Sequence, residues 1–138
     1  MNKYIADISG DIYFTKKDFE EINRYIGGDG ILGFSERGNG ETCEIFINFA
    51  VSVLSGISAE LLILIIKAIY KKSREKLKSS KREEVNPKII INSYNYDHCE
   101  MNFNFSIDFD NPDIKLDETA DMIINAANFI NKNLKWHD

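Results

Sequence analysis

The most reactive side chains in the sequence stand together at Asp97-His98-Cys99-Glu100. A thiolate beside an imidazole can act as a nucleophile, and carboxylates, imidazoles and thiolates all bind metals. Adjacent residues on an extended strand point to opposite faces, however, so His98 and Cys99 would not meet. A metal held by Asp97 and His98 would also lack a third and fourth ligand at a recognised spacing. We therefore interpret the segment as a polar turn followed by a strand cysteine.

The sequence carries no other pattern that is typical of catalysis or of cofactor binding. The loop-like segment Gly27-Gly28-Asp29-Gly30 opens no helix and lacks the Lys-Ser or Lys-Thr of a phosphate loop. No G-x-S-x-G, H-E-x-x-H or dinucleotide fingerprint occurs, and the chain has two histidines. We predict a protein that is not an enzyme and that uses no cofactor and no metal.

Length and composition are those of a single globular domain. The 138 residues are 43% hydrophobic and 28% charged, enough for a core without disulfides or metal. Cys43 and Cys99 lack C-x-x-C spacing and suit a reducing compartment, although the sequence leaves open whether they pair. The first residues, 1–7, contain no signal-peptide core. We expect a cytoplasmic protein, and the abundance of Ile, Asn and Lys suggests a bacterial or phage source.

The longest apolar run, residues 45–66, raises the question of a membrane span. Ser55-Gly56 divides it into pieces of strand and helix length, and Glu60 lies inside it. A carboxylate at the centre of a bilayer costs about 2.5–3.5 kcal/mol. We therefore predict a buried strand and a buried helix in place of a transmembrane segment.

Charge is divided unevenly along the chain. Residues 67–82 contain eight basic residues and one acidic residue, Glu75, for a net charge of +7. Since the whole chain carries −5, the remainder carries −12. A surface this acidic repels nucleic acid and attracts basic proteins. We expect a basic protein partner and no direct contact with nucleic acid.

Local patterns predict three helices. Thr15 is a suitable N-cap for the first, with Asp18 in the capping-box position, Phe14 and Phe19 spaced as a hydrophobic staple, and Gly27 at its end. A long helix should run from Ile57 to about Ser79, capped by Ser55 or Ser58, with its basic end projecting into water and a mobile basic linker at 78–86. Asp117 should cap the last helix, whose buried side is predicted to be Ile123, Ala126, Ala127, Ile130 and Leu134.

The strands are predicted from alternation and turn residues. Two short pieces, Tyr4–Ile8 and Ile12–Phe14, precede the first helix. The ranges Ile31–Glu36 and Thr42–Val53 predict one hairpin, and Lys88–Tyr96 with Cys99–Phe109 predict another. The sequence thus predicts one α+β domain over 1–138: an antiparallel sheet of two or three hairpins with three helices, one of them long and central, in the order ββαββαββα.

The last strand has one apolar face and one acidic, asparagine-rich face. Tyrosines just before it could anchor an interface, because tyrosine is enriched where interfaces concentrate their energy. We predict that a partner binds to Tyr94, Tyr96, Glu100, Asn102, Asn104, Asp108 and Asp110.

Two functional hypotheses follow from these features. The first is a bacterial or phage binding protein that neutralises a basic partner, as toxin-immunity proteins and inhibitors do, aided by electrostatic complementarity. The alternative is an interaction or regulatory module that uses the basic helix end (67–82) on an acidic partner or a membrane surface. Its contact residues would be Lys71, Lys72, Arg74, Lys76 and Lys78. A homodimer formed by pairing of sheet edges is a third possibility.

Overall fold

Five strands form one mixed sheet in the computed structural model, which describes residues 6–10, 12, 14–27, 32–34, 44–79, 87–94, 103–109 and 115–134. In spatial order the strands are β2 (Leu32–Phe34), β1 (Ala6–Gly10), β3 (Glu44–Ala50), β4 (Lys88–Tyr94) and β5 (Phe103–Asp108). The neighbouring strands β1 and β2 are parallel, as are β3 and β4, while β1 with β3 and β4 with β5 are antiparallel. The predicted α+β class and the last hairpin, β4–β5, are confirmed, but the prediction of an antiparallel sheet is wrong.

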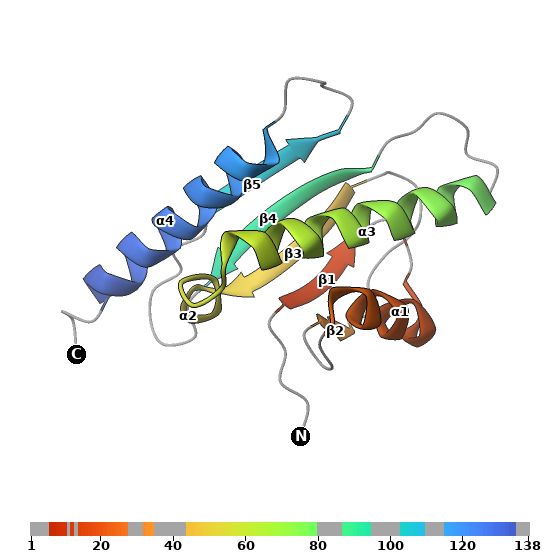
Figure 1. Cartoon of the computed structure of the whole chain (residues 1–138), viewed down its shortest axis with the longest axis horizontal. Coiled ribbons are helices and arrows are strands. Elements are labelled where there is room, and N and C mark those ends of the chain that lie inside the picture. Colours follow the sequence, from red (N-terminus) through yellow and green to blue (C-terminus); the bar gives the residue numbers. More distant parts are fainter. Residues whose placement is uncertain are drawn as a thin grey trace.

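Three long helices lie along one face of the sheet, as Figure 1 shows. The helix α1 (Lys16–Ile26) lies beside β1 and β2, α3 (Ala59–Ser79) crosses the centre, and α4 (Leu116–Leu134) lies toward β5. A single-turn helix, α2 (Val51–Leu54), directly follows β3. The predicted long central helix is confirmed.

Each parallel pair of strands is joined through a helix, because parallel neighbours need a crossover connection. The first unit is β1–α1–β2, and the second is β3–α3–β4. The first strands of the two units, β1 and β3, are antiparallel neighbours. The second strands, β2 and β4, lie on the opposite outer sides of this central pair (Figure 1). Since such crossovers are right-handed, both place their helix on the same side of the sheet. This topology explains why no helix of the described residues lies on the other side.

Two predicted strand pairings do not form. The ranges predicted as the first hairpin contribute β2 and β3, but β1 lies between these strands. Ile12 and Phe14 are buried outside any strand, because the chain turns away from the sheet after Gly10, whose φ is 136°. Tyr4 lies outside the described residues.

The helix termini follow the local signals closely. In α1, the Thr15 hydroxyl accepts from the Asp18 amide at 3.2 Å, and the Asp18 carboxylate accepts from the Thr15 amide at 2.7 Å. The rings of Phe14 and Phe19 lie 5.7 Å apart, which completes the predicted staple. Ser58 caps α3 by accepting from the Leu61 amide at 3.1 Å.

Two predictions about helix ends need correction. Asp117 lies in the first turn of α4, which begins at Leu116, so this carboxylate stabilises the helix through its dipole without being the cap. The basic half of α3 does not project into water: Ser73 and Leu77 are 0% and 3% exposed, and α3 packs against α1. The predicted linker 78–86 begins inside α3, which continues to Ser79, and residues 80–86 lie outside the described residues.

The core lies between the helical layer and the sheet. Alternate strand residues point into it, as two-fold side-chain periodicity requires. The fully buried strand side chains include Ile8, Ile45, Ile47, Phe49, Ile89, Ile91 and Ile107. The helices contribute buried side chains at Ile22, Leu62, Ile65, Ile66, Ile69, Ala120, Ile123 and Ala127.

Candidate protein-binding surface

The face of the sheet opposite the helices is accessible across β1, β3, β4 and β5. Residues that alternate with the buried ones retain partial or full exposure there. We call this surface the open sheet face. Its members with described side chains are Asp7, Ser9, Glu44, Phe46, Asn48, Lys88, Ile90, Asn92 and Ser106.

A line of amide and carboxylate residues crosses the open sheet face at one level. Strand register places Asp7 opposite Asn48, Asn48 beside Asn92, and Asn92 opposite Asn104. We call these four residues the asparagine row. The Asn92 side-chain amide donates to the Asn48 side-chain oxygen at 2.9 Å. That single bond uses only part of the two donors and two acceptor lone pairs that each amide offers.

An apolar pair lies next to the asparagine row. Register places Phe46 of β3 directly beside Ile90 of β4, and both side chains are half-buried. Serines flank the pair, with Ser9 opposite Phe46 and Ser106 opposite Ile90. Large apolar side chains surrounded by groups that can form hydrogen bonds are the usual composition of a protein-binding surface. The centre of the open sheet face therefore combines an apolar pair with side chains that can form hydrogen bonds.

The structure places the predicted partner-binding residues unevenly. Asn104 and Asp108 are in β5, where they alternate with the buried Ile107, and the exposed Ser106 lies between them. Tyr94 ends β4. The other predicted partner-binding residues lie outside the described part of the chain: Tyr96, Glu100, Asn102 and Asp110. The reactive segment 97–99 and Cys43 lie outside it as well.

Sequence analysis missed the part of the open sheet face that lies on the other strands. Asp7, Asn48 and Asn92 join Asn104 only through the strand register, which is not a local property of the sequence. A signal was present, because Asn48 interrupts an apolar strand sequence and Asn92 directly follows three isoleucines. In a central strand, such a residue marks the face that is not packed against helices.

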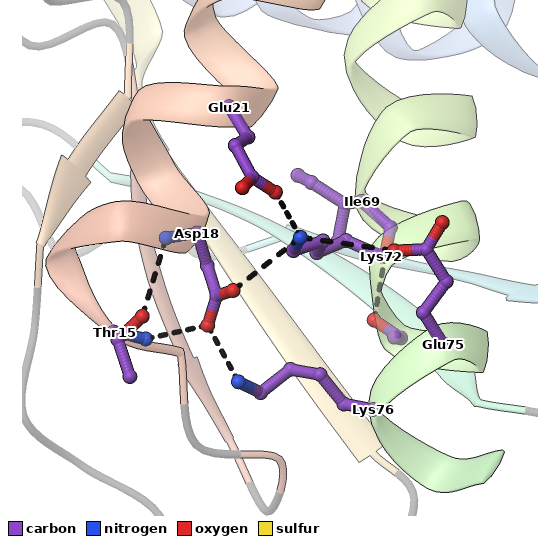
Figure 2. A network of polar contacts seen from close by, with 8 residues as sticks. Thr15, Asp18, Glu21, Ile69, Lys72, Glu75 and Lys76 are labelled. Atoms are coloured by element: carbon purple, nitrogen blue, oxygen red, sulfur yellow. Dashed lines mark hydrogen bonds and ion pairs between the residues drawn. The ribbon is translucent and has the colours of Figure 1, made fainter. Parts of the chain in front are cut away.

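The predicted basic patch is partly occupied by contacts within the protein. Figure 2 shows the Lys72 ammonium among three carboxylates: it pairs with Glu21, with Asp18 at 3.5 Å and with Glu75 at 3.7 Å. Lys76 pairs with the second oxygen of Asp18 at 2.5 Å. These contacts join α3 to α1. Of the predicted basic residues, Lys71 and Lys78 are exposed, and Arg74 is half-buried.

The ion pairs shift the pKa values of Asp18, Glu21 and Lys72, and these shifts couple stability to pH. Burial opposes ionisation of Asp18, but hydrogen bonds from Lys76 and Thr15 outweigh it, so the pKa of Asp18 is lowered. The hydrogen bond to Glu21 raises the pKa of Lys72, against the effect of burial. Lowering of a carboxyl pKa by folding gives stability that is complete above the unfolded pKa and is lost as pH falls through the folded pKa.

Replacing Asp18 with asparagine should test this coupling. The side chain of Asp18 is 11% exposed. Losing its charge should lower the free energy of unfolding by about 1–2 kcal/mol at neutral pH. The side-chain oxygen of asparagine can still accept the hydrogen bond from the Thr15 backbone amide. Below about pH 4, where an unfolded Asp takes up its proton, the difference between wild type and D18N should shrink. Urea unfolding at several pH values measures this. Glu20→Gln, exposed on the same helix, is the control, and a D18N deficit that is constant down to pH 2 would contradict the assignment.

A groove of about 130 Å³ lies beside this cluster, between α1 and α3. Tyr25, which is 58% exposed, lines it, and the Lys71 ammonium lies 5.8 Å from the centre of the Tyr25 ring. Pockets for drug-sized ligands measure about 300–1,000 Å³, so this groove suits a single side chain at most. It gives no support for a small-molecule substrate.

Neither a metal site nor a membrane span is found among the described residues. In these ranges no three His, Cys, Asp or Glu side chains gather closely enough to hold a metal ion. Over the same part of the chain, no helix combines the length and the apolar character needed to cross a bilayer. Comparisons with protein-family models, curated proteins and solved structures give no match to the chain.

Proposed function

We propose that this chain is a non-enzymatic binding protein that neutralises a basic protein partner, in the manner of a bacterial toxin-immunity protein or inhibitor. The open sheet face is its docking surface in this proposal. The observation that carries it is the asparagine row, which lies in register beside the half-buried pair Phe46 and Ile90. Amide groups supply directional hydrogen bonds, and the apolar pair supplies buried area at the centre.

Electrostatics favour a basic partner and orient it. On the open sheet face, two acidic residues, Asp7 and Glu44, outnumber one basic residue, Lys88, among the side chains that the structure describes, and the register places Asp108 opposite Lys88. The helical layer formed by α1 and α3 carries an excess of exposed positive charge. Three exposed carboxylates, Glu20, Glu60 and Glu75, are outnumbered there by six exposed cations: Lys16, Lys17, Arg24, Lys67, Lys71 and Lys78. A positively charged protein would be repelled by that layer and attracted to the open sheet face, which raises the association rate and limits the orientation of encounter.

The alternative, a module that binds through its basic helix end, loses two of its five cations to internal ion pairs. Lys72 and Lys76 face the carboxylates of α1 and would have to break those contacts to bind an acidic surface. Desolvating and separating such pairs costs free energy that an exposed cation does not. The open sheet face is therefore the better supported site.

The decisive experiment combines affinity capture with one pair of matched variants. The tagged protein should capture a stoichiometric basic protein from a lysate of its source organism, and that protein should be toxic when expressed alone. Asn92→Arg puts a cation at the centre of the open sheet face and should weaken binding at least a hundredfold, in line with hot-spot losses of about 2–4 kcal/mol. Asn128→Arg makes the same chemical change on the exposed surface of α4 and should bind normally.

The outcomes separate the hypotheses. If N92R binds the captured protein as tightly as N128R does, the open sheet face is not the docking surface. If the captured partner is acidic, and Lys71→Glu with Lys78→Glu abolishes its capture, the basic helix end is the site and the proposal is wrong. Capture that fails in every form of the protein also contradicts a dedicated inhibitor, because such complexes are among the tightest known.

A further inference from the structure

The outer surface of α4 carries an apolar stripe that the core does not use. Met122 and Phe129 are 60% and 69% exposed, although Ala120, Ile123 and Ala127 on the other side of the helix are fully buried. Seven residues separate Met122 from Phe129, so they lie on one line two turns apart. Fully buried and strongly exposed apolar residues on opposite sides of one helix indicate two packing surfaces.

The residues along this line have the spacing of a coiled-coil seam. The positions follow one another at intervals of four, three, four and three residues, which is the heptad pattern of residues that face a second helix. All five members are exposed. We call them the α4 seam: Glu118, Met122, Asn125, Phe129 and Lys132.

The α4 seam is self-complementary when reversed. A carboxylate, Glu118, stands at one end and an ammonium, Lys132, at the other, with Asn125 midway between them. The midpoint between Met122 and Phe129 falls within one residue of Asn125 as well. One two-fold axis near Asn125 therefore matches charge with opposite charge and apolar with apolar, whereas a parallel arrangement would oppose like charges.

We propose that two copies of this chain associate through antiparallel packing of α4 against α4 about a two-fold axis at Asn125. Glu118 of each copy then lies beside Lys132 of the other, Met122 packs on Phe129, and the two Asn125 amides meet at the axis. A polar residue at one seam position fixes the register of such a pair at some cost in stability. The half-buried Ala126 next to the axis allows the two backbones to approach closely.

This association leaves the open sheet face free. The α4 seam belongs to the helical layer, which covers one side of the sheet in Figure 1. The asparagine row is on the other side, because its residues alternate along the strands with those that are buried under the helices. A contact of one helix pair is at the small end of specific interfaces, so the dimer should be weak and its population should depend on protein concentration. A homodimer of this kind would offer two docking surfaces for a partner.

Sedimentation velocity and light scattering of the full-length protein test the proposal. Between about 1 and 300 µM, the range expected for a small interface, the apparent mass should rise from 15.9 kDa toward twice that value. Phe129→Glu should weaken association at least tenfold. Glu118→Lys and Lys132→Glu should each weaken it about two- to fivefold, as expected for exposed ion pairs, and the double swap should restore it.

The charge swap is specific for the antiparallel arrangement. Fourteen residues of helix separate Glu118 from Lys132, about 21 Å at 1.5 Å per residue, so the two side chains cannot compensate one another within one copy. An Asn125→Cys variant, with Cys43 and Cys99 replaced by serine, should form a disulfide-linked dimer on mild oxidation. Asn128→Cys, exposed on the same helix but off the seam, is the control and should not.

Two results would overturn the proposal. One is a protein that stays at 15.9 kDa at every concentration. The other is a dimer that F129E and the single charge reversals leave intact, which would place the contact on another surface, such as a sheet edge. If F129E proves misfolded by circular dichroism, the charge swap and the cysteine pair still decide, because they alter only exposed polar residues.

Discussion

Alanine at position 10 should lower the free energy of unfolding by about 3 kcal/mol or more. Gly10 has φ = 136°, a region where a residue with a Cβ costs about 1–3 kcal/mol. A Cβ built there would lie 2.4 Å from the carbonyl oxygen of Glu44 and 2.9 Å from the Cα of Ile45. Both are backbone atoms of β3, so relief requires moving one strand away from its neighbour. The β1–β3 hydrogen bonds at this end, about 1 kcal/mol each, would be weakened as well.

Gly27→Ala is the matched control for Gly10→Ala. Gly27 also has positive φ, at 88°, but beyond its own stretch of chain no atom of the described residues lies within 4 Å of the position that a Cβ would take there. Its replacement should cost only the backbone strain, about 1–2 kcal/mol. Urea unfolding followed by circular dichroism measures both. Equal losses in the two variants would mean that the contact with β3 is not what requires glycine at position 10.

Alanine at position 49 should cost about 3–5 kcal/mol, the usual loss when a buried phenylalanine is truncated. Phe49 is 0% exposed and lies in the central strand β3, on the side that faces the helices. Its removal leaves a cavity at the point where the sheet meets the helical layer. Since small domains have only about 5–15 kcal/mol of stability, F49A should be markedly destabilised or unfolded at 37 °C.

Phe46→Ala separates stability from binding. The same side chain is removed from the same strand, but on the open sheet face, where Phe46 is half-buried. The expected loss of stability is about 1 kcal/mol, because less apolar area leaves the core. In the proposed function, F46A should instead weaken partner binding at least tenfold, as loss of an interface anchor does. Should F46A destabilise the protein as much as F49A, the open sheet face would be part of the core and not a docking surface.

Features that depend on neighbouring residues were predictable from the sequence. The cap, capping box and staple of α1 involve only residues 14–19, and the glycine that ends it follows directly. Strand β5 was predicted from its strict alternation, and its pairing with β4 from the short separation between them. In each case the interacting groups lie close in sequence, so the energetic preference can be read without knowledge of the fold.

Strand pairing over longer separations was not predictable in the same way. The segment between β2 and β3 is glycine-rich and short enough for a hairpin, yet β1 takes the place between them. Which strand takes that place depends on packing across the entire chain, because β1 is more than thirty residues away from β3 in sequence. The asparagine row could not be predicted for the same reason, because its members become neighbours only through that strand order.

The basic half of α3 was also misjudged, because its pairing partners are on α1. A run of cations suggests a solvated surface when considered alone. The sequence assigned Asp18 only a capping role, but its two carboxylate oxygens also form ion pairs with Lys72 and Lys76. One carboxylate thus ties the start of α1 to the second half of α3. Its distant contacts leave no signature in the local sequence.

The parallel pairing of β3 with β4 has a consequence for synthesis of the protein. When β3 emerges from the ribosome, β1 can pair with one of its edges, but residues 51–87, which include α2 and α3, must still be translated before β4 can pair with the other edge. At about 5–20 residues per second, this leaves one edge of an isoleucine- and phenylalanine-rich strand uncovered for seconds. Such an edge is a template for aggregation. The nascent chain is therefore most vulnerable midway through translation, and chaperones that shield apolar segments would matter most at that stage.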